Sequence, residues 1–179
     1  MKGPSSPAGE PLEIERKFLI RRPEEDVLER ESFRRVEIEQ IYLTRQQKGE
    51  SRRIRQSRWD GETHYYYNEK VRLSPVTRIE REKEITPEAY AAFRREADPS
   101  RQIIRKTRWL ISAGELTLEV DVFPFWHSQA FCEAELTRED QPVTLPEWME
   151  LLREVTADER YTNNALAKRI PAEEAPPRR

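Results

Sequence analysis

The chain has 179 residues, of which 37% are charged, yet acids and bases nearly balance at a formal net charge of −2. The length fits one domain with its own core, and the lack of a basic excess argues against a nucleic-acid partner. The single cysteine, Cys132, cannot form an internal disulfide, and no segment resembles a signal peptide or a membrane span. We therefore expect a cytoplasmic protein without a membrane partner. The two histidines, His64 and His127, are too few and too scattered for a zinc site, so any metal would be held by oxygen.

The composition of the two ends predicts a disordered leader at residues 1–11 and a disordered tail at residues 171–179, around a single domain at 12–170. Asp60-Gly61 and Ala113-Gly114 are typical of tight turns between strands. Alternation of apolar and polar residues predicts strands at about 12–20, 39–46, 51–59, 62–73, 77–85, 102–111, 115–123 and 130–137.

Helices are expected at 24–34, 87–97, 144–155 and 162–169. Pro87 takes the favoured first position of the second helix, and Thr144-Leu-Pro-Glu147 is a capping box that would open the third. Many strands joined by hairpins, with few helices, predict an α+β but mainly β fold. We expect an eight-stranded antiparallel closed β-barrel with flanking helices, because closure removes the edges of the sheet.

Paired charges recur on one face of these strands. In the first strand Glu13, Glu15 and Lys17 share a face, with the two carboxylates about 7 Å apart, while Ile14 and Phe18 share the other face. Later strands repeat the pattern with Arg53 and Arg55; Tyr66, Asn68, Lys70 and Arg72; Arg78, Glu80, Glu82 and Glu84; Lys106 and Arg108; Glu119 and Asp121; and Glu133 and Glu135.

Two arrangements fit this ladder of charges. The charged faces could point to solvent around an apolar sandwich core, or they could line the inside of a barrel whose apolar rows face helices or a second subunit. Periodicity alone does not separate inside from outside. The residue types favour the second arrangement, because arginine grips phosphate bidentately and clustered acids repel one another unless a cation lies among them. The ladder thus predicts a divalent metal that joins carboxylates to a polyphosphate held by the basic strands.

The series of motifs resembles the CYTH superfamily, the triphosphate tunnel metalloenzymes, over about residues 12–170. Gln40-Ile41-Tyr42-Leu43-Thr44 is similar to the second strand of that family, and residues 155–167 are similar to the closing segment of its short bacterial members. The motifs in family order are E-x-E-x-K at 13–17, R-x-R at 53–55, the lysine at 70, R-x-E-x-E at 78–82, K-x-R at 106–108, E-x-D at 119–121 and the acidic pair at 133–135.

The resemblance implies a triphosphate tunnel that requires Mg²⁺ or Mn²⁺. The implied metal ligands are Glu13, Glu15, Glu119, Asp121, Glu133 and Glu135. The implied substrate contacts are Lys17, Arg53, Arg55, Lys70, Arg78, Lys106, Arg108 and Arg160. Catalytic roles, which orient the basic residues or the attacking water, fall to Glu80, Glu82, Asp121 and Glu133. Some relatives carry a substrate-binding lysine in the closing helix; here Asn164 takes its place, with Arg160 or Lys168 as candidate replacements.

The implied activity is hydrolysis of a triphosphate, foremost of inorganic tripolyphosphate to diphosphate and phosphate. The alternatives are a class IV adenylate cyclase, a thiamine or nucleoside triphosphatase, and a non-enzymatic polyphosphate-binding module. Four aromatic residues would either stack a base or thiamine or pack the barrel against its surroundings: Trp59, Tyr65, Tyr66 and Trp109. The outward apolar rows favour a homodimer.

Overall fold

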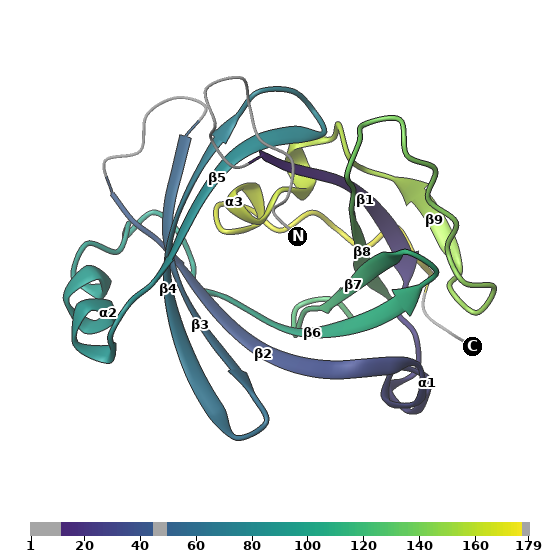
Figure 1. Ribbon diagram of the computed structural model, residues 1–179, viewed down its shortest axis with the longest axis horizontal. Helices are drawn as coiled ribbons and strands as arrows, with labels where there is room; N and C mark the ends of the chain where they lie inside the picture. Colours follow the sequence, from purple (N-terminus) through teal and green to yellow (C-terminus); the bar gives the residue numbers. More distant parts are fainter. Residues whose placement is uncertain (1–11, 45–49, 177–179) are drawn as a thin grey trace.

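The computed structural model describes residues 12–44 and 50–176, and its long strands form a barrel (Figure 1). The strands are β1 (Leu12–Arg21), β2 (Ser32–Tyr42), β3 (Glu50–Trp59), β4 (Glu62–Arg72), β5 (Thr77–Glu84), β6 (Ile104–Ala113), β7 (Leu116–Val122), β8 (Gln129–Glu135) and β9 (Leu151–Glu154). The helices are α1 (Glu25–Glu31), α2 (Pro87–Arg94) and α3 (Asn163–Leu166), with a 3₁₀ turn, η1 (Glu159–Tyr161). The expected leader, and residues 45–46 of the predicted second strand, lie outside the described residues.

The barrel closes along β1. The hydrogen-bonded order is β5-β4-β3-β2-β6-β7-β8-β1, and β1 also pairs with β5. The beginning of β1 pairs with β5, where Glu13 lies opposite Arg78, and its remainder pairs with β8, where Lys17 lies opposite Glu133. The predicted closed barrel of eight antiparallel strands is confirmed, and β9 adds one further strand to β1.

Local sequence signals explain two of the turns. Asp60 and Gly61 join β3 to β4 with φ angles of 50° and 80°, the left-handed conformation that a two-residue hairpin turn requires. Thr86 caps α2 by accepting a hydrogen bond from the backbone N–H of Ala89 at 3.2 Å, and Pro87 begins the helix. Both signals were expected from the sequence.

The helix predicted at 144–155 is wrong, because β9 occupies its second half. β9 pairs with Phe18 and Leu19, in the part of β1 that β5 does not reach. Without β9 the backbone groups on that side of β1 would lack strand partners. Pairing with the barrel therefore outweighs the local capping signal of Thr144-Leu-Pro-Glu147. The first helix also stops at Glu31 rather than at residue 34, since β2 begins at once.

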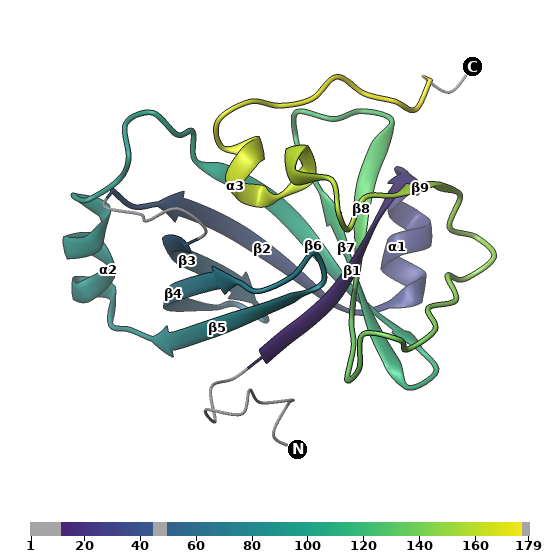
Figure 2. The same cartoon turned by 90° about the horizontal axis from the view of Figure 1, so that it is seen from above.

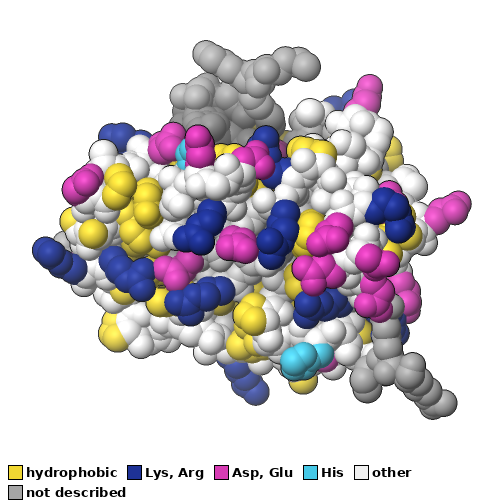
Figure 3. Space-filling model, turned by 90° about the horizontal axis from the view of Figure 1, so that it is seen from below, with side chains coloured by type: hydrophobic (Ala, Val, Ile, Leu, Met, Phe, Trp, Pro, Cys, Tyr) yellow, Lys and Arg dark blue, Asp and Glu magenta, His cyan; other side chains and the backbone are white. Residues whose placement is uncertain are grey.

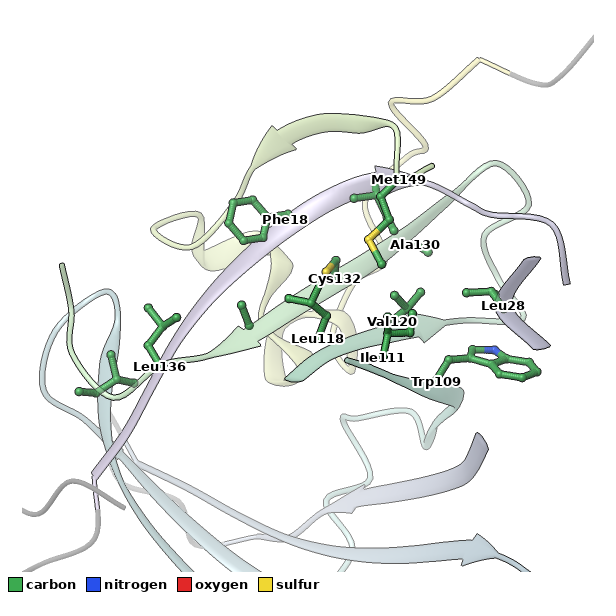
Figure 4. Packing of buried hydrophobic residues seen from close by; sticks show 13 residues of the cluster. Phe18, Leu28, Trp109, Ile111, Leu118, Val120, Ala130, Cys132, Leu136 and Met149 are labelled. Atoms are coloured by element: carbon green, nitrogen blue, oxygen red, sulfur yellow. The ribbon is translucent and has the colours of Figure 1, made fainter. Parts of the chain in front are cut away.

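The outer faces of β1, β6, β7 and β8 carry an apolar cluster, shown in Figure 4. Leu28 from α1 and Met149 from the segment before β9 pack onto this cluster. Trp109 lies in it with 4% of its surface exposed. A second outer cluster joins Ile54 of β3 to Tyr90 of α2. Elements of the same chain thus cover the outer apolar rows, and the homodimer stays a prediction.

One end of the barrel interior is filled by a third, largely aromatic cluster. Leu19 and Phe131 continue the inner faces of β1 and β8, and Tyr161 packs against Phe131 at 5.9 Å between ring centroids. The segment that follows α3 packs here as well, since Trp126 donates to the carbonyl oxygen of Pro171 at 3.2 Å. Ala175 is 3% exposed. Residues 171–176 of the expected tail therefore contact the barrel, and residues 177–179 lie outside the described residues.

The surface carries the remaining charges. Figure 3 shows one face on which basic and acidic side chains intermingle and apolar side chains form separate patches. In the part of the chain that the structure describes, no helix is long and apolar enough to cross a membrane.

Candidate active site

The inner faces of the strands enclose a charged cavity of about 450 Å³. We call it the central cavity. Residues two positions apart on each strand project to the same side of the sheet. The paired charges that recur in the sequence therefore line the wall of this cavity. The lining residues are Leu12, Glu13, Glu15, Gln40, Arg53, Arg55, Lys70, Glu80, Glu82, Lys106, Arg108, Glu119, Glu133, Glu135 and Asn163.

Lys106 and Arg108 of β6 are held by one buried carboxylate on β7. Asp121, with 0% of its surface exposed, accepts two hydrogen bonds from Arg108, each of 2.7 Å, and a third from Lys106 Nζ. Arg108 also pairs with Glu133 at 3.0 Å and with Glu119. Burial and the neighbouring Arg108 lower the pKa of Lys106 to about 8, although Asp121 opposes the shift. Asp121 therefore lies behind the two bases and fixes their direction.

Arg53 and Arg55 of β3 form a second basic wall. Arg55 pairs with Glu82 at 2.9 Å, and Arg53 lies 3.7 Å from Glu80. Asn68 donates to both glutamates, at 2.5 Å to Glu80 and 3.1 Å to Glu82. The Nε atoms of both arginines are buried and have no hydrogen-bond partner among the described residues. Buried unpartnered donors are rare, and here they provide binding capacity for an anion.

Carboxylates gather on the wall formed by β1 and β8. Glu15 lies directly opposite Glu135, so that two acids form one cross-strand pair. Glu13 binds Lys70 at 2.5 Å, and Glu15 binds Arg78. Burial, together with the nearby charges of Glu13 and Glu15, raises the pKa of Glu135. These carboxylates repel one another and lack full compensation from the bases around them.

This wall fits a divalent cation in its donor chemistry. Carboxylate oxygens are the ligands that Mg²⁺ and Mn²⁺ prefer, and a cation among Glu13, Glu15 and Glu135 would relieve the repulsion described above. Within residues 12–44 and 50–176, no three such side chains already converge as a metal site. Glu13 and Glu15 instead bind Lys70 and Arg78. Metal binding would therefore require these side chains to change partners.

Two further acids differ in their protonation. Burial raises the pKa of Glu119 to about 7, with Glu133 and Asp121 reinforcing the shift and Arg108 opposing it. Glu133 shifts the other way: against its burial, the charges of Lys17 and Arg108 hold its pKa well below the ordinary value. Lys17 pairs with Glu133 at 2.6 Å and donates to the carbonyl oxygen of Tyr161 at 3.3 Å.

A second cavity, of about 400 Å³, adjoins the central one beneath η1 and α3. We call it the distal cavity. The two share Arg53, Lys70 and Asn163 as lining residues. In Figures 1 and 2, α3 lies across one end of the barrel. The lining residues of the distal cavity are Lys17, Tyr42, Glu50, Ser51, Arg53, Lys70, Arg72, Arg78, Glu159, Thr162, Asn163, Asn164, Ala165 and Lys168.

Most of the residues that the sequence indicated line these cavities. Lys17 and Arg78 line the distal cavity rather than the central one. Asp121 lines neither, and lies directly behind Lys106 and Arg108. Arg160 is not brought to the site: its side chain is 68% exposed and pairs with Asp158 at 2.7 Å. Sequence reasoning missed Asn163, although a polar residue near the start of the closing helix was a usable signal.

The four aromatic residues singled out in the sequence divide between the two faces of the barrel. Trp109 and Tyr65 pack outside, Tyr65 against Tyr90 of α2 at 4.9 Å. Trp59 lies on the same face of β3 as Arg55, and Tyr66 lies directly opposite Arg55 on β4. Both aromatic residues therefore belong to the inner face. The guanidinium of Arg55 lies over the ring of Tyr66 at 5.0 Å.

The barrel is closed, charged inside and largely apolar outside. The CYTH domain profile matches residues 11–169, and the chain belongs to the CYTH domain family. A search of curated proteins gave no match.

Solved structures show the same fold. The inorganic triphosphatase NE1496 is 29% identical, with 89% of this chain and 97% of that chain covered and a TM-score of 0.56. A conserved hypothetical protein from Pyrococcus furiosus is 26% identical over 72% of this chain and 80% of that chain, with a TM-score of 0.54. The PH1819 protein from Pyrococcus horikoshii OT3, at 21% identity with the same coverage and TM-score, shows the fold alone. The family match and the triphosphatase neighbour support an enzyme that acts on phosphoanhydrides.

Proposed function

We propose that this protein hydrolyses inorganic tripolyphosphate to diphosphate and orthophosphate with the aid of Mg²⁺ or Mn²⁺. The observation that carries the proposal is the separation of charge around one cavity. Arg53, Arg55, Lys106 and Arg108 lie on β3 and β6, while the crowded carboxylates lie on β1 and β8. Anion capture alone needs the bases and gains nothing from the acids, whereas hydrolysis through a bound metal needs both.

The basic strands would bind the phosphate chain. Arg53 and Arg55 each keep a buried Nε donor, and Lys70 lies between the two cavities. Lys106 and Arg108 are held by ion pairs with the buried Asp121. Together these side chains neutralise the phosphate oxygens, which otherwise repel an incoming nucleophile, and stabilise the charge of a loose transition state.

The acidic wall would hold the metal. Glu13, Glu15 and Glu135 are the proposed ligands, with Glu119 and Glu133 close enough on β7 and β8 to serve a second ion. The chemistry that such a metal would supply is polarisation of the phosphoryl group. Asp121 remains a positioning residue, because both of its oxygens are taken by Lys106 and Arg108.

Glu80 and Glu82 would orient the attacking water. Both line the central cavity beside the two arginines, and Asn68 fixes their direction. The water oxygen forms a bond to a terminal phosphorus as the bridging P–O bond breaks, diphosphate leaves, and a carboxylate accepts the proton of the water. Against its burial, Lys70 and Arg53 lower the pKa of Glu80, which keeps it ionised and able to orient that water.

A nucleoside triphosphatase is the second candidate. The Tyr66 ring, stacked with Arg55 on the inner face, offers a surface on which a base could stack next to the phosphate site. A substrate panel separates the candidates: tripolyphosphate, ATP and thiamine triphosphate, with analysis of orthophosphate and cyclic AMP. The proposal expects fast release of phosphate from tripolyphosphate and little from the other two. Cyclic AMP without orthophosphate would indicate a cyclase, and binding without any turnover would indicate a polyphosphate-binding module.

A further inference from the structure

Two glutamates of β5, Glu82 and Glu84, are candidate partners for Arg55. Arg55 of β3 lies directly opposite Tyr66 of β4, and Tyr66 lies directly opposite Glu84. Glu84 is therefore the acid in the same cross-strand row as Arg55, whereas Glu82 lies two residues away on β5. The guanidinium nevertheless pairs with Glu82, at 2.9 Å. Because Glu82 lines the central cavity and Glu84 does not, this pairing directs Arg55 toward the proposed phosphate site.

The charge of Arg55 is incompletely compensated where it lies. Burial lowers its pKa, with Glu82 opposing the shift and the charges of Arg53 and Arg108 adding to it. A buried cation of this kind is attracted by any further carboxylate within reach. The pairing with Glu82 alone therefore needs a physical cause that keeps Glu84 away.

The Tyr66 ring provides one such cause. It stands on the inner face of β4, between Arg55 and Glu84 in the cross-strand row. The guanidinium of Arg55 lies over this ring at 5.0 Å, a contact that stabilises a cation but not a carboxylate. Burial raises the pKa of Tyr66, and Glu84 adds to the shift while Arg55 opposes it. The ring thus lies close to both charges and separates them.

His64 provides the second cause, because it binds Glu84 itself. The Nδ1 atom of His64 and Oε1 of Glu84 are 3.0 Å apart, and a carboxylate can only accept, so Nδ1 is the donor. Two ring contacts fix the direction of the imidazole. It stacks on Trp59 with 3.9 Å between centroids and planes 8° apart, and it stacks with Tyr66 at 6.5 Å. Glu84 is therefore held toward the hairpin end of β4 and away from Arg55.

We propose that Tyr66 and His64 are positioning residues that direct Arg55 to Glu82, and so into the central cavity, by keeping it from Glu84. The role of Arg55 in phosphate binding rests on the proposed function. When either ring is lost, the guanidinium turns to Glu84 and its contact with the phosphate chain is lost.

The test begins with His64→Ala, which frees Glu84 to attract Arg55. We expect the KM for tripolyphosphate with Mg²⁺ to rise by about 3- to 10-fold while kcat changes by less than about twofold. An unchanged KM would overturn the proposal. His127→Ala is the matched control, because the second histidine is exposed between β7 and β8, and its KM should equal that of the unmodified protein.

Removal of the competing carboxylate separates this role from a merely structural one. Glu84→Gln alone should leave KM unchanged, and the double variant His64→Ala/Glu84→Gln should return KM to the value of the unmodified protein. A KM that stays raised in the double variant would overturn the proposal, since it would indicate that His64 only holds the hairpin together.

Two variants of Tyr66 test the ring independently of His64. Tyr66→Phe keeps the aromatic face and should keep KM, whereas Tyr66→Leu removes the face and should raise KM as His64→Ala does. Equal KM values in the two variants would overturn the role of the ring.

Crystal structures of the unmodified protein and of His64→Ala, both without substrate, report the partner of Arg55 directly. We expect Glu82 in the first and Glu84 in the second, and Glu82 in both would overturn the proposal. If the partner changes as expected but the unmodified protein releases no phosphate from tripolyphosphate, the proposed function is wrong and the positioning role stands.

Discussion

Glu15 of β1 lies directly opposite Glu135 of β8, so two carboxylates form a cross-strand pair inside the barrel. Like charges placed opposite each other destabilise a sheet, and this pair lies at the wall where Glu13 also projects. Two residues further along, Lys17 lies opposite Glu133 and forms an ion pair of 2.6 Å. Glu15 is paired with Arg78, whereas Glu135 has no ion-pair partner among the described residues. The Glu15–Glu135 end is therefore where we propose that a cation binds.

Glu15→Gln should therefore abolish turnover without unfolding the protein. The amide removes a charged metal ligand but keeps the size of the side chain and relieves repulsion with Glu135. We expect phosphate release from tripolyphosphate to fall by at least about 100-fold. The variant should still unfold cooperatively in urea, because relief of the repulsion with Glu135 offsets part of the loss of the ion pair with Arg78. Turnover near that of the unmodified protein, with unchanged Mg²⁺ dependence, would contradict the metal assignment.

Arg55→Ala should weaken substrate binding. Its guanidinium pairs with Glu82, and its buried Nε atom has no hydrogen-bond partner among the described residues. Because the variant loses a charge-assisted contact to phosphate, we expect its KM for tripolyphosphate to be higher by about 10- to 100-fold. Arg105→Ala is the matched control, because Arg105 also pairs with a glutamate but lies on the outer surface. Steady-state kinetics measure KM for tripolyphosphate in the two variants. An unchanged KM in Arg55→Ala would count against the phosphate assignment.

Glu119 should make stability depend on pH. Burial raises its pKa from 4.5 to about 7, so between these values the native state binds more protons at this site than the unfolded state does. The free energy of unfolding should therefore decrease as pH rises from 4.5 to 7, and the full penalty is present above 7. Urea titrations in EDTA should show this decrease, and Glu119→Gln should reduce it. An identical pH profile in the variant would refute the shift.

Asp121→Asn should destabilise the fold. Removing the charge of Asp121 leaves the buried Lys106 without its ion-pair partner and Arg108 with only Glu119 and Glu133, at a cost of about 3–5 kcal/mol. Glu39→Gln is a matched surface control, because Glu39 also joins two bases, Arg94 and Arg105, but does so on the exterior. Its cost should stay below about 1 kcal/mol. Denaturant titration measures both, and equal costs would show that burial of Asp121 does not matter.

Much of the barrel could be predicted because its signals are local. Alternation placed most of the long strands, although β2 begins at Ser32 and not at residue 39. Asp60-Gly61 carries the backbone conformation that its hairpin needs. The charge ladder also predicted which side chains share a face, since parity along a strand is fixed by backbone geometry. The pattern alone did not show whether the charged face points inward. The abundance of arginine and of paired acids favoured an inward-facing charged face, and the structure has this arrangement.

The failures involve contacts between segments that are distant in the sequence. β9 forms because β1 needs a partner beyond the reach of β5, and nothing in residues 144–155 alone indicates this need. The closing segment was predicted only in part: Asn164 and Lys168 line the distal cavity as expected, Asn163 lines both cavities unexpectedly, and Arg160 lines neither. The direction of a short helix at the end of a barrel is set by tertiary packing, here by the contact of Tyr161 with Phe131.

The most direct test of the proposed chemistry is release of orthophosphate from tripolyphosphate by the full chain, with Mg²⁺ or Mn²⁺ and with EDTA. The account predicts fast release with the metal, one diphosphate for each orthophosphate, and none with EDTA. Release that persists in EDTA, or no release under any condition, would contradict it.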